Sequence, residues 1–116
     1  MSPFAQNKIM DHILSSAFIS LHFKEPGDTG KNEISSVNYK RINASNLFLP
    51  SKKGVKNLGS DILFTKLPTT TITHIGIWDQ EKNGNFLVGI ELDPKRDVLE
   101  GDSFTIPANE LSLSIS

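Results

Sequence analysis

The three histidines are the first residues to consider, because imidazole acts both as a general base and as a zinc ligand. They are His12, His22 and His74. No two of them show the HxH, HxxxH or HExxH spacing that places two imidazoles on one metal. A GxSxG motif, which would mark a nucleophilic serine, is also missing. The pattern therefore predicts neither a zinc site nor a serine hydrolase, and we expect each histidine to be a surface or half-buried side chain.

Acidic side chains gather in two loops that also contain glycine and proline. The first loop holds Glu25, Asp28 and Glu33, and the last holds Asp93, Asp97, Glu100 and Asp102. Calcium requires six to eight oxygen ligands, often from a DxDxDG-like segment, and neither loop has that pattern. Acids beside Gly and Pro are what ordinary turns use, so we interpret both loops as turns. A glycosidase needs two facing acids and no pair is singled out, so no catalytic residue, metal or cofactor is predicted.

Composition narrows the function classes further. The 116 residues carry 12 Lys and Arg against 13 Asp and Glu, whereas proteins that bind phosphate backbones usually carry a basic excess. Lys52, Lys53 and Lys56 form the only basic cluster, which we interpret as a solvated loop. The absence of cysteine excludes disulfides and thiol catalysis. The N-terminal residues do not have the pattern of a signal peptide or a membrane span, so we expect neither a membrane nor a nucleic-acid partner.

Residues 1–16 show the pattern of one short helix. Ser2 suits the N-cap and Pro3 suits the first helical position. Apolar residues then recur at helical spacing: Phe4, Ile9, Met10, Ile13 and Leu14. We expect these side chains to pack in the core, with anchoring to a partner as the alternative.

From Ala17 the apolar period changes to two, which is the period of a β-strand. Ile19, Leu21 and Phe23 fall on one face of this strand, and Ser20, His22 and Lys24 on the other. Further strands are predicted at 34–42, 46–49, 60–66, 70–79, 86–92, 103–106 and 111–115. Turn-forming clusters separate them at intervals typical of an antiparallel β-sandwich or jelly-roll-like barrel. We therefore predict one mainly β domain over residues 1–116, with strands over 17–116.

Two loops have more specific expectations. In EPGDTGKNE, Pro26 and Gly27 are expected to set the turn and Gly30 to adopt an unusual φ. In QEKNGN, the Asn83-Gly84 pair favours positive φ and predicts a hairpin. We interpret the first loop mainly as a reversal of the chain, with a role in an interface as the second interpretation.

Tyr39 and Arg41 share one face of the predicted 34–42 strand. Glu33 lies close enough along the chain to reach an arginine or a backbone amide nearby. We therefore expect these three residues to form a structural pairing, with a contact across subunits as the alternative.

The order of these blocks resembles a family of small virion structural proteins of tailed bacteriophages, often labelled tail-fibre or minor structural proteins. Its pattern is LHxxDPGxxGxxE, then GYxR, then TITHxGIxD, a Gly-Asn turn and GDxxxIPAGxLxLxL, and the resemblance spans nearly the whole chain. The matching positions are Leu21, His22, Pro26, Gly27, Gly30, Glu33, Tyr39, Arg41, Thr71, Ile72, Thr73, His74, Gly76, Ile77, Asp79, Gly84, Asn85, Gly101, Asp102, Ile106, Pro107, Ala108 and Leu111. Asn38 and Asn109 replace glycines of that pattern, and asparagine tolerates the same backbone geometry.

The resemblance implies a non-enzymatic component of the virion, assembled in the host cytoplasm. It implies a homo-oligomer whose partners are the major capsid protein or other virion proteins. Capsid decoration is the favoured placement, because a chain of this size shows no collagen repeat, heptad run or β-helix period for a shaft. The alternative is a tail or tail-fibre component with a host-receptor or glycan-binding role. The interface candidates are Phe4, Ile9, Ile13, Glu33, Tyr39, Arg41 and Trp78.

Two other function classes stay open at this point. A glycan-binding module would be favoured by an exposed Trp78 or Tyr39 beside polar groups. An enzyme would require a cleft with two facing acids.

Overall fold

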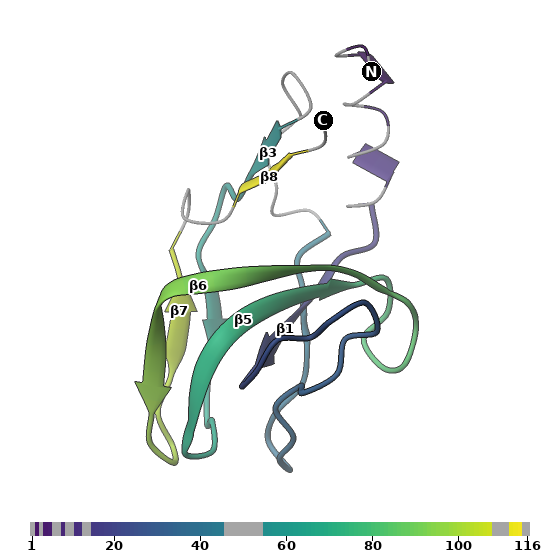
Figure 1. Ribbon diagram of the computed structural model, residues 1–116. Coiled ribbons are helices and arrows are strands. Elements are labelled where there is room, and N and C mark those ends of the chain that lie inside the picture. Colours follow the sequence, from purple (N-terminus) through teal and green to yellow (C-terminus); the bar gives the residue numbers. More distant parts are fainter. Residues whose placement is uncertain are drawn as a thin grey trace.

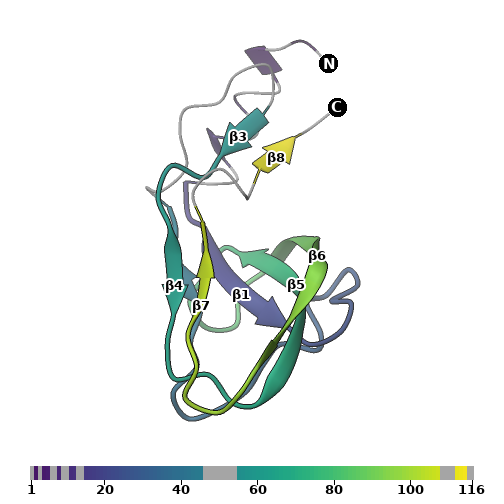
Figure 2. The same cartoon turned by 90° about the vertical axis from the view of Figure 1, so that its left-hand side faces the viewer.

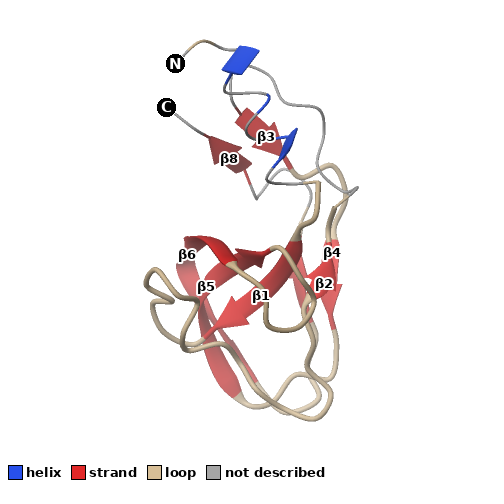
Figure 3. Ribbon diagram, turned by 90° about the vertical axis from the view of Figure 1, so that its right-hand side faces the viewer, coloured by secondary structure: helices blue, strands red, loops and turns tan. Residues whose placement is uncertain are grey.

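The regular structure of the described residues is mainly antiparallel β (Figure 1). It is a computed structural model that describes residues 2, 4–5, 8, 11–12, 15–45, 55–107 and 112–114. Within these residues, strands account for nearly all regular structure, and helical backbone is confined to the N-terminal end (Figure 3). The mainly β class predicted from the sequence is therefore confirmed.

A four-stranded antiparallel sheet forms the main body, in the order β2-β1-β5-β6. These strands are β1 (Phe18–His22), β2 (Ile42–Asn43), β5 (Thr70–Trp78) and β6 (Phe86–Val98). The long β5–β6 hairpin pairs Thr70 with Val98 at one end and Trp78 with Phe86 at the other, and β6 bends along its length (Figure 1). The hairpin turn contains Asn83 at φ 56° and Gly84 at φ 75°, as its Asn-Gly pair predicts.

Two short ladders complete the fold. Strand β4 (Ile62–Phe64) pairs with β7 (Phe104–Ile106), and β3 (Val55–Asn57) pairs with β8 (Ser112–Ser114). The β4–β7 ladder shares one apolar cluster with the large sheet, whereas β3 and β8 lie apart at one end of the molecule (Figures 1 and 2). The shared core members on these strands are Ile19, Leu21, Ile62, Phe64, Ile72, Ile75, Ile77, Val98, Phe104 and Ile106.

The sandwich or jelly-roll-like barrel is not confirmed by this pairing. The β4–β7 ladder covers the core side of the large sheet, but neither of its strands hydrogen-bonds to β2 or β6. A hollow of about 400 Å³ separates β6 from β7, lined in part by Ile90, Leu92, Phe104 and Ile106. The two sheets therefore share a core without the described strands closing into one continuous barrel.

Among the described residues of the range 1–16, the predicted N-terminal helix is not seen as a continuous element. Helical backbone is described for the ranges 4–5 and 11–12 and for Lys8, and Ser2 Oγ accepts a hydrogen bond from the amide of Ala5 at 3.2 Å. The candidates Ile9 and Ile13 lie outside the described residues, as does the predicted 46–49 strand.

Two predicted strands have the wrong bounds. The 34–42 strand is reduced to Ile42–Asn43, because a turn closed by Tyr39 N–H and the Ser36 carbonyl replaces its first part. Strand β6 continues six residues beyond the predicted end, through Pro94. A proline is tolerated there because β6 is an edge strand and needs ladder bonds on one side. Strand β3 was not predicted.

Candidate functional site

The outer face of the large sheet is covered on β1 and at Gly76 and Trp78 of β5, whereas Gly89 and Glu91 of β6 are exposed. The loop after β1 closes on itself, because Gly30 and Lys31 both donate their amide hydrogens to the Pro26 carbonyl. Gly30 has a φ of 79°, which confirms the unusual φ predicted for it, and Gly27 also has a positive φ, of 62°. The loop lies so close to the sheet that a Cβ on Gly30 would collide with the rings of Trp78 and Phe86. The packing of this loop buries the face of β1 that the sequence pattern predicts to be polar and solvent-exposed.

Ser20 and His22 lie under this cover, and both are fully buried. The prediction that His22 is a surface or half-buried side chain is therefore wrong. The strand alternation is correct, but the second face of β1 meets the loop instead of water. Gly76 on β5 leaves the necessary space, since a Cβ there would meet Ser20 Oγ and His22 Nε2.

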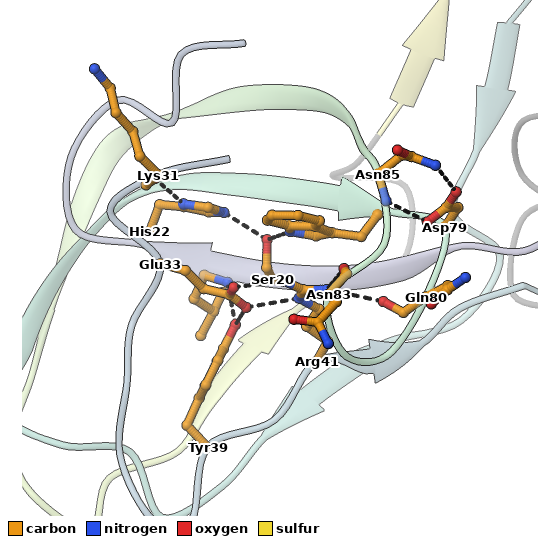
Figure 4. Close-up of polar contacts among 12 residues, drawn as sticks. Ser20, His22, Lys31, Glu33, Tyr39, Arg41, Asp79, Gln80, Asn83 and Asn85 are labelled. Atoms are coloured by element: carbon orange, nitrogen blue, oxygen red, sulfur yellow. Dashed lines mark hydrogen bonds and ion pairs between the residues drawn. The ribbon is translucent and has the colours of Figure 1, made fainter. Parts of the chain in front are cut away.

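Arg41 is the centre of the polar network beside this face (Figure 4). Its Nε and Nη2 donate to the two carboxylate oxygens of Glu33 at 3.0 and 2.9 Å. Its Nη1 donates to the carbonyls of Gln80 and Asn83 at 3.1 and 2.8 Å. The guanidinium carbon also lies 3.6 Å from the centre of the Trp78 ring. One side chain thus joins the first loop, the β5–β6 turn and the sheet.

Tyr39 completes the environment of the Glu33 carboxylate. Its hydroxyl donates to Glu33 Oε2 at 2.7 Å and accepts a hydrogen bond from the Leu21 amide at 3.0 Å. Burial, followed by the neighbouring Glu33 carboxylate, raises the pKa of Tyr39 far above its usual range. The phenol is therefore a fixed, neutral hydrogen-bonding group.

A second chain of hydrogen bonds runs from Trp78 to the loop (Figure 4). Trp78 Nε1 donates to Ser20 Oγ at 2.9 Å, and Ser20 Oγ lies 2.7 Å from His22 Nε2. His22 Nδ1 lies 2.9 Å from the Lys31 carbonyl. Since a carbonyl only accepts, Nδ1 carries the proton and Nε2 accepts from the serine. Burial lowers the pKa of His22, although the Lys31 carbonyl and Glu33 oppose that shift. The neutral imidazole satisfies every partner.

The Ser20–His22 pair has the distance of a nucleophile and its base, but it lacks the access that catalysis requires. Both residues have no exposed surface, and Trp78 already donates to the serine oxygen. The pair therefore holds the loop on the sheet.

Four of the predicted interface residues lie together in this network: Glu33, Tyr39, Arg41 and Trp78. The expected pairing of Glu33 with Arg41 and Tyr39 is present, but it forms across a loop and a turn rather than along one strand. Trp78 is only 8% exposed, so it offers no open platform for a sugar. Phe4 is 73% exposed, with Lys8 Nζ 6.0 Å from its ring centre.

The sequence reasoning missed Ser20, His22 and Phe86 as members of the site. Glycines within β5 and β6 could have pointed to them, because a glycine inside a strand often marks close approach by another segment. Gly76 faces the Ser20–His22 pair, and a Cβ on Gly89 would meet Pro26 of the covering loop.

Two open hollows flank the covering loop. The first, of about 450 Å³, is lined by Glu25, His74 and Glu91 among others. Both of these acids are exposed, whereas a glycosidase acid needs burial to raise its pKa. The second, of about 440 Å³, lies beside the Glu33–Arg41 pair, between residues 34–36 and residues 81–83.

Other forms of chemistry gain no support from the part of the chain that the structure describes. It contains no group of three His, Asp or Glu side chains placed to hold a metal ion. It also contains no helix with both the length and the apolar character needed to cross a membrane. Asp97 and Asp102 take part in local structure, bonding Thr71 Oγ1 and the Leu99 amide.

A family model described as Podophage GP4 fiber I protein gp80 matches residues 1–114. The chain belongs to this family. Membership in a fibre family supports the phage structural class that the sequence motifs implied, and with it a component of the virion. It favours the tail-fibre placement and gives no support to capsid decoration. None of the curated proteins matches the chain.

Proposed function

We propose that this fibre-family protein is a non-enzymatic building block of a podophage tail fibre that contributes to attachment of the virion to its host. The observation that carries the proposal is the family match over residues 1–114. The geometry is compatible with a structural role, because the Ser20–His22 pair, which has the distance of a nucleophile and its base, is buried and hydrogen-bonded. The side chains that could do chemistry instead fix the loops in place.

The proposed partners are other virion proteins and further copies of this chain. Among the described apolar side chains, Val37 is the most exposed at 97%, and Leu63 is 53% exposed. Val37 lies in the turn between Ser36 and Tyr39, whose base is held by the Glu33–Tyr39 bond. We include this turn among the proposed contacts with neighbouring proteins, since its apolar side chain lies fully at the surface.

Separated virion parts provide the test. Heads and tails are purified from disrupted virions, and the copies of this chain in each fraction are counted by quantitative mass spectrometry. We expect a low copy number that stays with the tails. Hundreds of copies on the heads would instead establish the decoration role and overturn the proposal.

The oligomeric state is measured separately on the purified chain by light scattering. A homo-oligomer is expected, as symmetric assemblies are the common form of virion proteins.

A further inference from the structure

The hollow beside the Glu33–Arg41 pair has the properties of a small polar binding site. Its volume of about 440 Å³ lies within the range of ligand pockets in proteins. Its inner side consists of Glu33, Tyr39 and Arg41, which are held by the bonds described above. Residues 81–83 form another side, and Arg41 clamps this segment through the Asn83 carbonyl. The walls are therefore fixed before any ligand arrives.

The charges at this hollow favour an anion. Glu33 is occupied by a bidentate pairing with Arg41 and by the Tyr39 hydroxyl. Lys40 and Lys82 also line the hollow, are exposed, and form no described ion pair. Glu81 is the remaining acid on the rim. Two lysines and one glutamate without a described ion pair thus line the hollow, beside the paired Glu33 and Arg41.

One hydroxyl at the same place has no partner in the unliganded chain. Ser36 lines the hollow, and its Oγ is buried with no hydrogen bond among the described residues. A buried hydroxyl without a partner is costly, so a group that supplies one is favoured.

From these observations we propose that the hollow binds an acidic sugar residue of a host surface polysaccharide. In this arrangement the anionic group of the sugar lies between Lys40 and Lys82. A hydroxyl group of the sugar forms hydrogen bonds with Ser36 and with polar groups of Asn83. A sugar suits the site, because every lining residue except Ile34 has a polar or charged side chain, and the open hollow admits a polysaccharide from solvent. The identity of the ligand source rests on the proposed function, but the binding chemistry does not.

The test is a titration of the full purified chain with small ligands. Binding is measured by isothermal calorimetry and by NMR chemical-shift changes. The probes are trigalacturonate, its uncharged methyl ester, and glucose 6-phosphate. Trigalacturonate is expected to bind, the ester is not, and added salt weakens binding because the lysines are exposed. Stronger binding of the sugar phosphate supports the anionic-sugar site and assigns a phosphosugar source. Equal binding of the ester, or no binding by either anion, overturns the proposal.

Paired variants locate the site. The double variant Lys40→Gln and Lys82→Gln is expected to weaken binding about tenfold, from two exposed charge contacts. Lys24→Gln with Lys95→Gln is the matched control, because these lysines line a different hollow. The proposal fails if the control pair loses as much affinity, or if the first pair loses none.

Ser36→Ala separates a binding role from a structural one. The hydroxyl makes no described bond in the free chain, so its removal should leave the melting temperature unchanged or raised. Binding should fall about fivefold, the value of one hydrogen bond. A lowered melting temperature with unchanged binding contradicts the proposed role of Ser36.

These results are independent of the location of the chain in the virion. A tail-located chain that binds none of the probes defeats this inference alone. A head-located chain that binds trigalacturonate defeats only the proposed function.

Discussion

Arg41 shows at the residue scale why the first loop, the β5–β6 turn and the sheet stay together. It uses four hydrogen bonds and one ring face, and only 8% of its side chain is exposed. A planar guanidinium can serve all these partners at once because its donors point in fixed, different directions. An ammonium group is a single point charge and lacks this geometry.

Replacing Arg41 by lysine should therefore destabilise the protein although the charge is retained. We expect a loss of about 2 kcal/mol in the free energy of unfolding for Arg41→Lys, and about 3 kcal/mol or more for Arg41→Ala, which leaves Glu33 without its ion pair. Chemical denaturation measures both. Arg96→Lys is the matched control, since Arg96 is exposed on β6 and should change stability little. Equal losses at the two positions would contradict the role given to Arg41.

His22 gives the protein a stability that depends on pH. Burial holds its folded-state pKa below the usual value of 6.5, so the unfolded chain binds the proton more readily. The stability that comes from keeping His22 neutral is fully present above pH 6.5. It is lost as the pH falls from 6.5 toward the lowered pKa of His22. The free energy of unfolding should fall between pH 7.5 and pH 5 in the native chain.

The dependence should be nearly flat in His22→Gln, which cannot be protonated in this range. His12→Gln is the control, because His12 is exposed and should leave the slope unchanged. If the native chain is equally stable at both values of pH, the neutral, buried state assigned to His22 is incorrect.

At the scale of elements, the covering loop depends on small residues at defined places. Gly30 and Gly101 both have positive φ, at 79° and 88°, so alanine strains the backbone at either position. Only at Gly30 would the new methyl collide with Trp78 and Phe86, since nothing lies within 4 Å of a Cβ at Gly101. The two positions therefore separate backbone strain from packing.

We expect Gly30→Ala to cost about 1 to 3 kcal/mol more than Gly101→Ala, which is the range for overpacking. Thermal unfolding of both variants provides the comparison. Amide hydrogen exchange should also rise in residues 24–33 of the Gly30 variant only. Equal losses for the two alanines would show that packing of the loop on the sheet adds little.

The sequence predicted those features that depend only on residues a few positions apart in the chain. The Asn83-Gly84 hairpin and the positive φ of Gly30 follow directly from backbone sterics. The burial of Ser20 and His22 could not be predicted this way, because it depends on a loop that folds back over the strand. Alternation specifies two faces but does not say whether the polar one meets water or another segment.

The same limit explains the missed strand bounds. Tyr39 and Arg41 alternate as strand residues do, yet both bond to Glu33, and a turn at Ser36 brings them there. In β6 the Asp-Pro pair resembles a turn, but an edge strand has no need of the missing proline donor. Pairing of side chains distant in the chain therefore explains the missing part of the 34–42 strand. The edge position of β6 in the sheet explains why that strand continues through its proline.

At the scale of the whole molecule, the principal extents are 45, 25 and 22 Å. The elongation reflects the β3–β8 ladder, which lies beyond the end of the main sheet (Figure 1). The exposed Val37 belongs to the main body instead, in the turn held by Tyr39. A variant at Val37 therefore tests the proposed contact of the main body without altering the ladder.

Val37→Ser should leave the fold intact and reduce incorporation into virions. An apolar side chain that is 97% exposed contributes little to folding, so the melting temperature should change by less than about 2 °C. The number of copies per virion, measured by mass spectrometry after complementation, should decrease. Leu99→Ser is a control at another exposed apolar position. Full incorporation of the Val37 variant would remove this turn from the list of contacts.

The chain has a single tryptophan, and it lies within the buried network, under Arg41 and at 5.2 Å from Phe86 between ring centres. Its fluorescence therefore reports on the docking of the loop without any label. A red shift of the emission that precedes the loss of far-ultraviolet circular dichroism would mean that the loop leaves the sheet before the strands separate. Coincident transitions would mean that the covering loop and the sheet unfold as one unit, so that the hollow beside the Glu33–Arg41 pair persists for as long as the fold does.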